Sequence, residues 1–576
     1  MWLFFSKEIE KRKVKKVFLP TTKDEVKQLG WITLDIILVT GDTYIDTPFV
    51  GAALIGKLLL NAGYRVGIIA QPDIDNPKDI GRLGEPQLFW GVTAGSLDSM
   101  IANYTATGKK RKKDDLTPGG INNRRPDRAT IVYSNLIRRY FKNTKPIVLG
   151  GIEASLRRLA HYDFWDNKIR RSILFDSKAN FLIYGMAEKS VLQLAERLKR
   201  QEQVDDLRGI CYISKSPVQN SIILPSFSEV RKDVKKFIEM FHLFYENQNP
   251  SSGQTLSQKY DNRYLIHNPP SYPLTTTELD KVYEFDYERE IHPYYRKWGK
   301  VRALDTIKFS VTSHRGCFGE CNFCAITVHQ GKYIQSRSQK SIISEIKYLI
   351  GRKDFKGYVL DVGGPTANMY GMECIQKRKG NYCVKKRCLF PSICANLSVN
   401  HKAQIKLLRA IRKIKGVKKV FIASGLRYDL VLADQKNGEH YLRELINYHL
   451  SGQLKIAPEH IDSKILTLMG KDNNNLLSRF KKLFNRINDQ EGLKQYLTYY
   501  FMAAHPGCRE KDMVHLKEYI KKELQIKPEQ VQIFIPAPST YSAIMYYTER
   551  NPFTGDKIFV EKKVKNKDNQ KKVITN

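Results

Sequence analysis

Three cysteines in one short loop constrain this chain more than any other feature. Cys317, Cys321 and Cys324 have C-x3-C-x2-C spacing and follow IKFSVTS, a β-branched and aromatic run that predicts a strand. An iron–sulfur cube normally takes four cysteine ligands, so a loop that supplies three leaves one iron open. Structural zinc is the alternative, but it prefers four closed ligands in paired spacings. The triple therefore predicts a 4Fe–4S cluster that can bind a further ligand.

This spacing resembles that of radical S-adenosylmethionine (SAM) enzymes. In that superfamily the methionine moiety of SAM chelates the fourth iron, and an electron from the cluster cleaves a carbon–sulfur bond. An aromatic residue there precedes the third cysteine and packs near the adenine, and Phe323 occupies that place here. The resemblance implies SAM as a cofactor and Phe323 as one of its contacts.

Length and composition bound the remaining choices. The chain has 576 residues, of which 42% are hydrophobic, enough for two or three globular domains. No run of about 18 apolar residues predicts a membrane helix, and the opening MWLFF precedes a basic stretch, the reverse of a secretory signal. We expect a cytoplasmic protein without membrane contact, whose nine cysteines stay reduced.

The formal net charge of +37 favours a polyanionic partner. The basic residues are spread along the whole chain, with local runs at 109–113 and 561–572, and no motif interleaves them with aromatic residues. RNA is therefore a candidate substrate or partner, although a lysine-rich proteome would give the same charge.

The first part of the chain predicts an α/β domain. Strand-like runs alternate with helical patterns, which favours parallel pairing in a sheet covered on both faces. The spacing predicts a flavodoxin-like or Rossmann-like domain over residues 1–245, with ligand sites beyond the carboxyl ends of its strands. The runs are DIILVTGD from Asp35, YRVGIIAQ from Tyr64, LFWGVTAG from Leu88, PIVLGGIEAS from Pro146 and NFLIYGM from Asn180.

Two glycine-containing turns follow predicted strands, at 41–48 and 150–158. Glycines let a ligand approach the backbone, and ordinary turns are the alternative. The pattern also resembles the cobalamin-binding domain that precedes many radical SAM cores. We do not expect cobalamin, because Thr47 stands where the histidine of a D-x-H-x-x-G motif would be sought.

The second part predicts another α/β unit. Residues 246–300 are polar and contain Pro269, Pro270 and Pro273, which predicts a linker and wrapping segment. Strand-like runs then recur over 301–547, as in a partial (β/α) barrel whose site faces the carboxyl ends of its strands. Residues 548–576 form a lysine-rich tail, where we expect the ordered core to have ended.

Further candidate residues stand at the ends of these strands. Gly363 and Gly364 match the glycine-rich loop that faces the SAM methionine in the superfamily, and Ser424 and Arg427 stand where polar cofactor contacts are often found. Glu459, His460 and His505 also end strands, although a lone histidine is more often structural. The catalytic residues stay unassigned.

Four more cysteines lie close together after the glycine loop. Their C-x8-C-x4-C-x5-C spacing is not that of a zinc ribbon, and thiolates select zinc or iron–sulfur centres. The sequence therefore predicts a second metal site and leaves the metal open between zinc and an auxiliary cluster. These residues are Cys374, Cys383, Cys388 and Cys394, while Cys211 and Cys508 are isolated and are expected to be buried.

Several longer segments together resemble the YgiQ family of radical SAM proteins, over about residues 20–547. The resemblance implies a Rossmann-like N-terminal domain, a radical SAM partial barrel, and Cys317, Cys321 and Cys324 as ligands of a 4Fe–4S cluster, but no particular substrate. The segments include LGWITLDIILVTGD, FWGVTAGSLDSMI, LGGIEASLRRLAHYDFWD, HRGCFGECNFCAI, DVGGPTANMY, IASGLRYDL, LKIAPEH and AAHPG.

The sequence thus predicts an enzyme that cleaves SAM to generate a 5′-deoxyadenosyl radical. Modification of RNA or protein is the favoured reaction, and an electron donor such as flavodoxin or ferredoxin is the expected partner. Two alternatives stay open: a non-catalytic, metal-stabilised protein that binds RNA or the ribosome, and a cobalamin-dependent radical methyltransferase.

Overall fold

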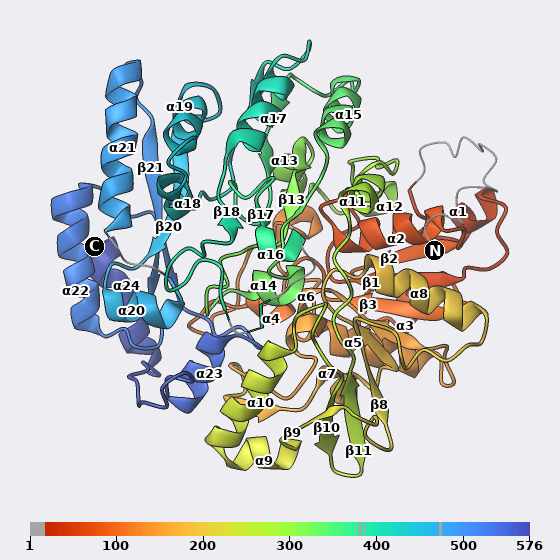
Figure 1. Cartoon of the computed structure of the whole chain (residues 1–576). Helices are drawn as coiled ribbons and strands as arrows, with labels where there is room; N and C mark the ends of the chain where they lie inside the picture. Colours follow the sequence, from red (N-terminus) through yellow and green to blue (C-terminus); the bar gives the residue numbers. More distant parts are fainter. Residues whose placement is uncertain (1–17, 379–382, 385, 472–474) are drawn as a thin grey trace.

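The computed structural model of the chain describes residues 18–378, 383–384, 386–471 and 475–576. It has a mixed α/β fold in which the largest described sheet lies in the N-terminal half (Figure 1). In their order across this sheet, the strands are β2 (Val66–Ala70), β1 (Ile36–Thr40), β3 (Phe89–Thr93), β4 (Ile147–Leu149), β7 (Phe181–Ile183), β8 (Ile210–Ser214), β11 (Arg263–His267), β10 (Leu256–Tyr260) and β9 (Ile222–Leu224).

The first five strands of this order run parallel, from β2 to β7. Their order is that of a flavodoxin-like sheet, so the fold class predicted from the sequence is confirmed. The helices and the small hairpin of this half are α1 (Lys23–Gln28), α2 (Gly51–Asn61), α3 (Pro77–Ile80), α4 (Ser99–Asn103), α5 (Ala129–Tyr140), α6 (Gly151–Leu156), β5 (His161–Asp163), β6 (Lys168–Arg170), α7 (Ile173–Ser177), α8 (Glu188–Lys199), α9 (Phe227–Lys232), α10 (Val234–Glu246), α11 (Thr276–Tyr283), α12 (Pro293–Arg296) and α13 (Ala303–Ile307).

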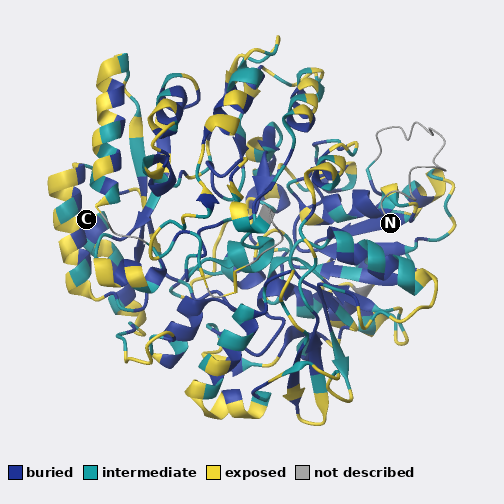
Figure 2. Cartoon of the chain, in the orientation of Figure 1, coloured by how far each residue is buried: buried dark blue, intermediate teal, exposed yellow. Residues whose placement is uncertain are grey.

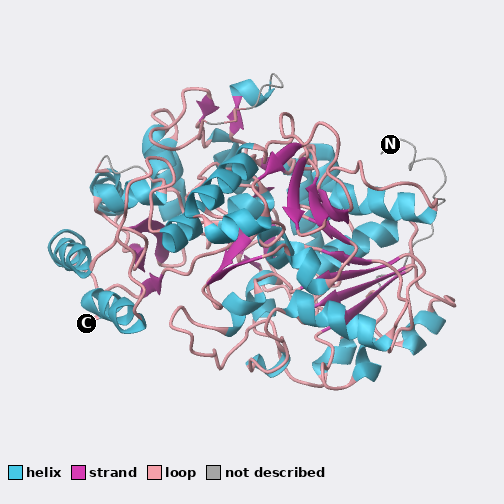
Figure 3. Cartoon of the chain, turned by 90° about the horizontal axis from the view of Figure 1, so that it is seen from below, coloured by secondary structure: helices cyan, strands magenta, loops and turns pink. Residues whose placement is uncertain are grey.

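Strand β1 shows why its apolar run forms a central strand. Ile37 and Val39 pack into a core on one face of the sheet, while Ile36 and Leu38 pack into a second core on the other face. Successive side chains of a strand alternate between faces, so a continuous apolar run suits a sheet covered on both sides. Figure 2 shows these strands in the dark blue of buried residues, and Figure 3 shows helices around the strands.

The segment predicted as a linker contains regular structure. Strands β10 and β11 form a hairpin across Asp261, whose φ of 52° suits a two-residue turn, and they extend the N-terminal sheet. These two strands were not predicted because their sequence is polar. Gln258, for example, is buried and makes hydrogen bonds there: its side chain accepts from the Ala160 N–H at 3.2 Å and donates to the Pro225 carbonyl at 3.0 Å. Pro269, Pro270 and Pro273 lie outside helices and strands, as expected.

The second half builds an open, curved array of parallel strands. β12 (Ser310–Thr312) pairs with β16 (Asp361–Gly363), and β20 (Gln453–Glu459), β21 (Tyr496–Ala503) and β22 (Gln530–Ile533) pair in that order. Backbone bonds from Val362 to Phe421 at 3.2 Å and from Leu426 to Lys455 at 2.8 Å connect the two groups. The remaining strands are β13 (His314–Arg315), β14 (Gln335–Ser336), β15 (Tyr358–Val359), β17 (Glu373–Cys374), β18 (Leu397–Ser398) and β19 (Lys419–Val420).

Many helices of this half lie along its outer side (Figure 1). The helices of this half are α14 (Ala325–Gln330), α15 (Gln339–Ile350), α16 (Ile375–Arg378), α17 (Lys402–Arg412), α18 (Tyr428–Ala433), α19 (Gly438–Tyr448), α20 (Ser463–Met469), α21 (Leu476–Glu491), α22 (Glu510–Tyr519), α23 (Tyr541–Thr548) and α24 (Val564–Thr575).

The sequence predicted that the ordered core ends near Tyr547. The structure contradicts this, because the lysine-rich end of the chain forms a helix that packs onto the core. Helix α24 packs against α22, β21 and β22. Gln570 and Ile574 are buried, and the Gln570 amide accepts from the Ala504 N–H at 2.9 Å and donates to the Cys508 carbonyl at 3.3 Å. The sequence did not predict this contact because the buried side chain of Gln570 is polar and is satisfied by backbone groups, so the helix lacks a clear apolar periodicity.

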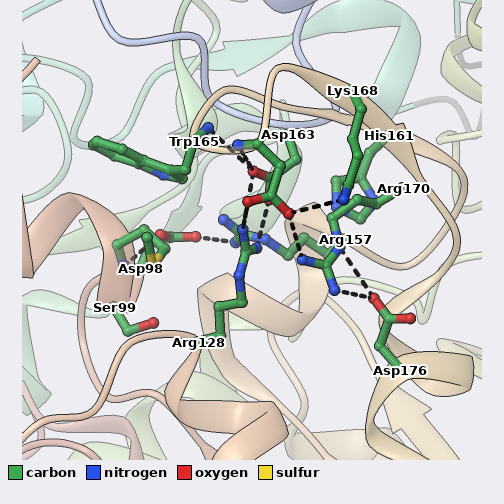
Figure 4. Close-up of polar contacts among 12 residues, drawn as sticks. Asp98, Ser99, Arg128, Arg157, His161, Asp163, Trp165, Lys168, Arg170 and Asp176 are labelled. Carbon is green, nitrogen blue, oxygen red and sulfur yellow. Dashed lines mark hydrogen bonds and ion pairs between the residues drawn. The ribbon is translucent and has the colours of Figure 1, made fainter. Parts of the chain in front are cut away.

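A network of ion pairs ties the β5–β6 hairpin to the N-terminal sheet (Figure 4). Arg128 holds the buried Asp163 with both guanidinium nitrogens, at 2.6 and 3.1 Å, and Arg157 pairs with Asp98 nearby. Burial opposes the charge of Asp163, but the hydrogen bonds and charge of Arg128 outweigh it and hold the pKa of this carboxyl well below its usual range. The ionised pair therefore stabilises the folded chain.

Replacing Arg128 by Gln should lower the free energy of unfolding by about 2 kcal/mol at pH 7, because Asp163 loses its charged partner. Because the pKa of Asp163 is lowered on folding, its contribution is complete above its unfolded value of about 3.9 and is lost as the pH falls from that value through its much lower folded value. Urea unfolding from pH 7 to pH 3 should show a constant difference between the two proteins down to about pH 4 and the beginning of its decrease at the acid end. Lys168→Gln is the control, since Lys168 lies 3.6 Å from Asp166 and is 62% exposed. An equal effect of both substitutions would contradict this account.

Candidate functional site

The three-cysteine loop begins where β13 ends and leads into α14. Gly316 precedes Cys317 with a φ of 83°, and a Cβ there would overlap the Tyr333 carbonyl oxygen. Only glycine allows this turn, so the sequence HRGC fixes the start of the loop. Within the loop, the Gly319 N–H donates to Cys317 Sγ at 3.3 Å.

The three thiols gather around this loop. Cys317 Sγ and Cys321 Sγ lie 3.2 and 3.6 Å from where a Cβ on Gly319 would stand, and Cys324 interacts electrostatically with both. Burial raises the pKa of the Cys324 thiol to about 12 and also raises that of Cys317. Buried thiols of this kind keep their protons until a metal displaces them.

Among the described residues, no three His, Cys, Asp or Glu side chains are placed to share one metal ion. Each thiolate of an iron–sulfur cube ligates a different iron, so the ligands of a cube do not converge on one point.

Arg427 brings a positive charge to these thiols. Its Nη1 lies 3.6 Å from Cys321 Sγ, and its Nε donates to Asp429 at 3.0 Å. Burial opposes the charge, but Asp429 and the thiols of Cys321 and Cys317 outweigh it and hold the pKa of Arg427 above its usual value. The sequence predicted Arg427 as a cofactor contact, and the structure places it against the thiol of Cys321.

A cavity of about 600 Å³ lies beside the loop and extends between the two halves of the chain. One wall carries the predicted Gly363, Gly364 and Ser424, at the carboxyl ends of strands of the second half. Ser424 is held by Asp361, which also accepts from the Ala423 N–H at 2.9 Å. Three of the residues predicted to contact a cofactor thus line one cavity.

His314 lines the same wall and was missed by the sequence reasoning. Its Nδ1 lies 2.9 Å from Ser313 Oγ, while its buried Nε2 has no hydrogen-bond partner among the described residues. A Cβ on Gly364 would stand 2.7 Å from that Nε2, so the glycine allows the close approach. Burial lowers the pKa of His314 to about 4, which leaves a neutral imidazole facing the cavity. Its place three residues before Cys317 was the available signal.

The opposite wall is the carboxyl edge of the N-terminal sheet. The start of α2 lies here, and Asp42 stands at the end of β1, paired with the buried Arg125 at 2.7 Å. Glycines follow three neighbouring strands at this wall, so no side chains project from these positions into the cavity. These glycines are Gly95 after β3, Gly150 and Gly151 after β4, and Gly185 after β7.

A buried ion pair joins the two walls. Glu188 begins α8 in the N-terminal half, and its carboxylate accepts from Arg315 on β13, two residues before Cys317. Both residues line the cavity, and the second carboxylate oxygen of Glu188 has no partner among the described residues. This pair fixes the cysteine loop relative to the N-terminal sheet.

Other predicted residues lie away from the cavity lining. Phe323 packs edge-on to His505, at 6.3 Å between ring centres. His505 is satisfied by the Pro506 carbonyl and Ser542 Oγ, at 2.9 and 2.8 Å, and has a structural role. His460 accepts from the Asp462 N–H at 3.0 Å. Glu459 is buried, with one carboxylate oxygen unpartnered within the described part of the chain, and interacts electrostatically with Cys324.

The other cysteines fall into two groups. Cys374, Cys388 and Cys394 are partly exposed and Cys383 is exposed, whereas Cys211 and Cys508 are buried, as the sequence predicted for these two. Thr47, where a cobalamin-binding histidine was sought, is fully buried.

Family models match both halves of this chain. "Radical SAM N-terminal" covers residues 18–310, and "Radical SAM superfamily" covers residues 311–520. A UPF0313 protein of Fusobacterium nucleatum is 57% identical over 97% of this chain and 98% of its own length. The chain belongs to the UPF0313 family. A further UPF0313 protein, from Thermotoga neapolitana, is 50% identical over 96% of this chain and 97% of its own.

This family membership makes the chain a radical SAM enzyme, and it confirms the recognition of such a family from the sequence. Among solved structures, the radical SAM methyltransferase TsrM of Kitasatospora setae, with cobalamin and a [4Fe–4S] cluster bound, matches with a TM-score of 0.51 and 11% identity over 89% of this chain and 78% of that one. At this identity the likeness concerns the fold. In the part of the UPF0313 chain that the structure describes, no helix has the length and apolar character needed to cross a bilayer.

Arg427→Met should weaken cluster retention, because it removes a positive charge beside the thiolates. A charge-assisted contact of about 1.5–3 kcal/mol corresponds to roughly tenfold or more in the rate of iron loss to a chelator. Asp429→Asn is the control, since it weakens the same ion pair and keeps the cation. Equal iron loss from both variants would show that the pair, rather than the charge, matters.

Proposed function

We propose that this enzyme holds a 4Fe–4S cluster with Cys317, Cys321 and Cys324 and cleaves SAM reductively. The observation that carries the proposal is the position of the three-cysteine loop, which is flanked by Arg315 and Ile326, both of which line a cavity that reaches from the barrel strands to the N-terminal sheet. When bound, the cluster and SAM supply a 5′-deoxyadenosyl radical that abstracts hydrogen from a substrate.

The residues of the chain would prepare this cavity in three ways. Gly363 and Gly364 leave room for the methionine moiety of SAM, and Ser424, held by Asp361, offers a hydroxyl to its polar groups. Arg427 balances the negative charge of the thiolates. Apolar side chains make up much of the remaining lining and would exclude water from a reactive radical, among them Phe49, Val92, Val148, Met186 and Ile326.

The cavity has room for more than SAM. Binding sites of about 300–1,000 Å³ enclose drug-sized ligands, so about 600 Å³ accommodates the cofactor with a substrate group beside it. A second hollow of about 100 Å³ shares Gly185, Glu188, His329 and Gln330 with this cavity and reaches the exposed Tyr272. We propose it as the path by which a substrate group reaches the radical.

Modification of RNA or protein is our proposal for the reaction class, and the net charge of +37 supports an RNA substrate. The same charge suits an acidic electron donor such as flavodoxin or ferredoxin, because opposite charges raise the rate of encounter. The non-catalytic RNA-binding alternative is disfavoured by membership in a family of radical SAM enzymes.

The anaerobically reconstituted and reduced enzyme should form 5′-deoxyadenosine from SAM, and faster when the fraction of cell RNA, protein or small molecules that holds the substrate is added. A variant with Cys317, Cys321 and Cys324 all replaced by Ala should form none, while Cys211→Ala, at a buried isolated thiol, should match the wild type. Product from the triple variant, or zinc bound at the triple in the wild type, would overturn the proposal.

A second candidate is cobalamin-dependent methyl transfer, which the sequence argued against. The observation that favours it is the glycine-rich carboxyl edge of the N-terminal sheet. This edge lies across the cavity from Gly363, Gly364 and Ser424, and its lack of side chains leaves room for a broad cofactor. TsrM was solved with cobalamin bound. A corrinoid here would bind without the histidine ligand, because Thr47 occupies that place and is buried.

Enzyme purified from corrinoid-replete cells should then carry about one corrinoid per chain, seen in its visible absorption spectrum. Gly151→Leu should abolish this binding, because the side chain would enter the cavity wall where Gly151 has a φ of 79°. Gly492→Leu, at a positive-φ site with open space around it, is the control. Enzyme without corrinoid from such cells excludes this candidate and leaves the first one intact.

A further inference from the structure

The described parts of the four-cysteine segment are residues 373–378, 383–384 and 386–398, and we name them the cysteine-rich insertion. Strands β17 and β18 pair antiparallel at its base and place Cys374 opposite Leu397. The Cys394 N–H donates to the Cys388 carbonyl at 2.8 Å, and the Leu397 N–H donates to the Cys394 carbonyl at 2.9 Å. These bonds bring together cysteines that are up to twenty residues apart in sequence.

The thiols of the insertion interact with one another. Cys388 has electrostatic contact with both Cys374 and Cys394, and Cys383 lies on the same insertion, where its carbonyl accepts from the Asn249 amide at 3.5 Å. Three thiols of the insertion thus lie close together, and Cys383 of the same insertion is the fourth, as many as an iron–sulfur cube takes.

Exposure distinguishes these cysteines from packing residues. Cys211 and Cys508 are fully buried, as expected of a small apolar side chain. Cys374, Cys388 and Cys394 are only partly buried, like the three cysteines of the first loop. Cys388 and Cys394 pack against a small apolar core, whereas Cys383 is exposed, so packing does not account for the whole set.

Basic side chains surround the thiols. Lys377 interacts electrostatically with Cys374 and Cys388, and Lys332 also interacts with Cys388. The buried Glu320 lies close to Cys388 as well, but it is met by Lys332 at 3.6 Å and by the Tyr245 hydroxyl at 2.8 Å. A metal centre with four thiolates carries net negative charge, which these lysines would balance.

The spacing of the four cysteines favours a cluster over zinc. Structural zinc sites typically pair their ligands about two to four residues apart, whereas the gaps between these cysteines are eight, four and five residues. Cys317, Cys321 and Cys324, the other cysteine set of this chain, likewise lack the paired spacing of a zinc ribbon.

The insertion also adjoins the first loop. Cys388 and Cys394 pack against the same small apolar core as Cys317, formed around Phe318 and Leu389. Arg387 of the insertion donates to the Glu320 carbonyl, within the first loop, at 3.4 Å. A metal centre at the insertion would therefore lie next to the SAM-binding cluster.

We propose that Cys374, Cys383, Cys388 and Cys394 bind a second iron–sulfur cluster, adjacent to the first. The proposal does not depend on SAM cleavage, because it concerns only which metal centre these four thiols hold.

The full chain, reconstituted anaerobically with iron and sulfide, should hold about eight irons and eight sulfides. The variant with Cys317, Cys321 and Cys324 replaced by Ala should keep about four of each, with a reduced-state electron paramagnetic resonance signal that SAM does not change. Cys388→Ala/Cys394→Ala should also keep about four, and Cys211→Ala should keep all eight. Circular dichroism spectra that match the wild type show which variants are folded.

Two results would overturn the second cluster. One is a wild-type chain that never exceeds four irons after reconstitution, a measurement that needs no variant. The other is a triple-alanine variant that binds one zinc ion and no sulfide. The proposed SAM chemistry is measured separately, since it predicts a SAM-dependent signal from Cys388→Ala/Cys394→Ala whatever the insertion binds.

Discussion

Parallel pairing is the constraint on which this structure depends. In a parallel sheet every strand ends at the same edge, so the loops that follow the strands gather on one side. The chain contains two such arrays, and their carboxyl edges face each other across one cavity. The Glu188–Arg315 pair fixes the position of one edge relative to the other, because it joins the first turn of α8 to the strand that leads into the cysteine loop. The proposed cofactor and substrate sites then share one cavity.

Much of the fold could be predicted because burial leaves a direct trace in sequence. The run Ile36–Thr40 and its counterparts are apolar throughout, as strands covered on both faces must be. Strands β10 and β11 left no such trace, because Gln258 reaches its buried position through hydrogen bonds. The packing of helix α24 was not predicted for the same reason, because its buried Gln570 makes hydrogen bonds to the backbone. Burial by hydrogen bonding depends on partners far away in sequence, which periodicity does not reveal.

The site was predicted to a similar degree and for related reasons. Cysteine spacing is local, so the loop of Cys317 was visible at once, and glycines after a strand are visible too. Glu188 could not be found, since its partner Arg315 lies 127 residues away. His460 and His505 looked like candidates at strand ends, but their ring nitrogens meet local backbone or hydroxyl groups. A one-dimensional pattern gives residue type and order, whereas the partner that satisfies a side chain is a property of the fold.

The β10–β11 hairpin has a further consequence at the far side of the molecule. It places the three-residue β9 at one margin of the largest described sheet, immediately before Pro225. A short margin next to a residue without a backbone N–H offers a poor template for a strand from another molecule. In an enzyme of this size, that hairpin would discourage self-association while the chain is still folding.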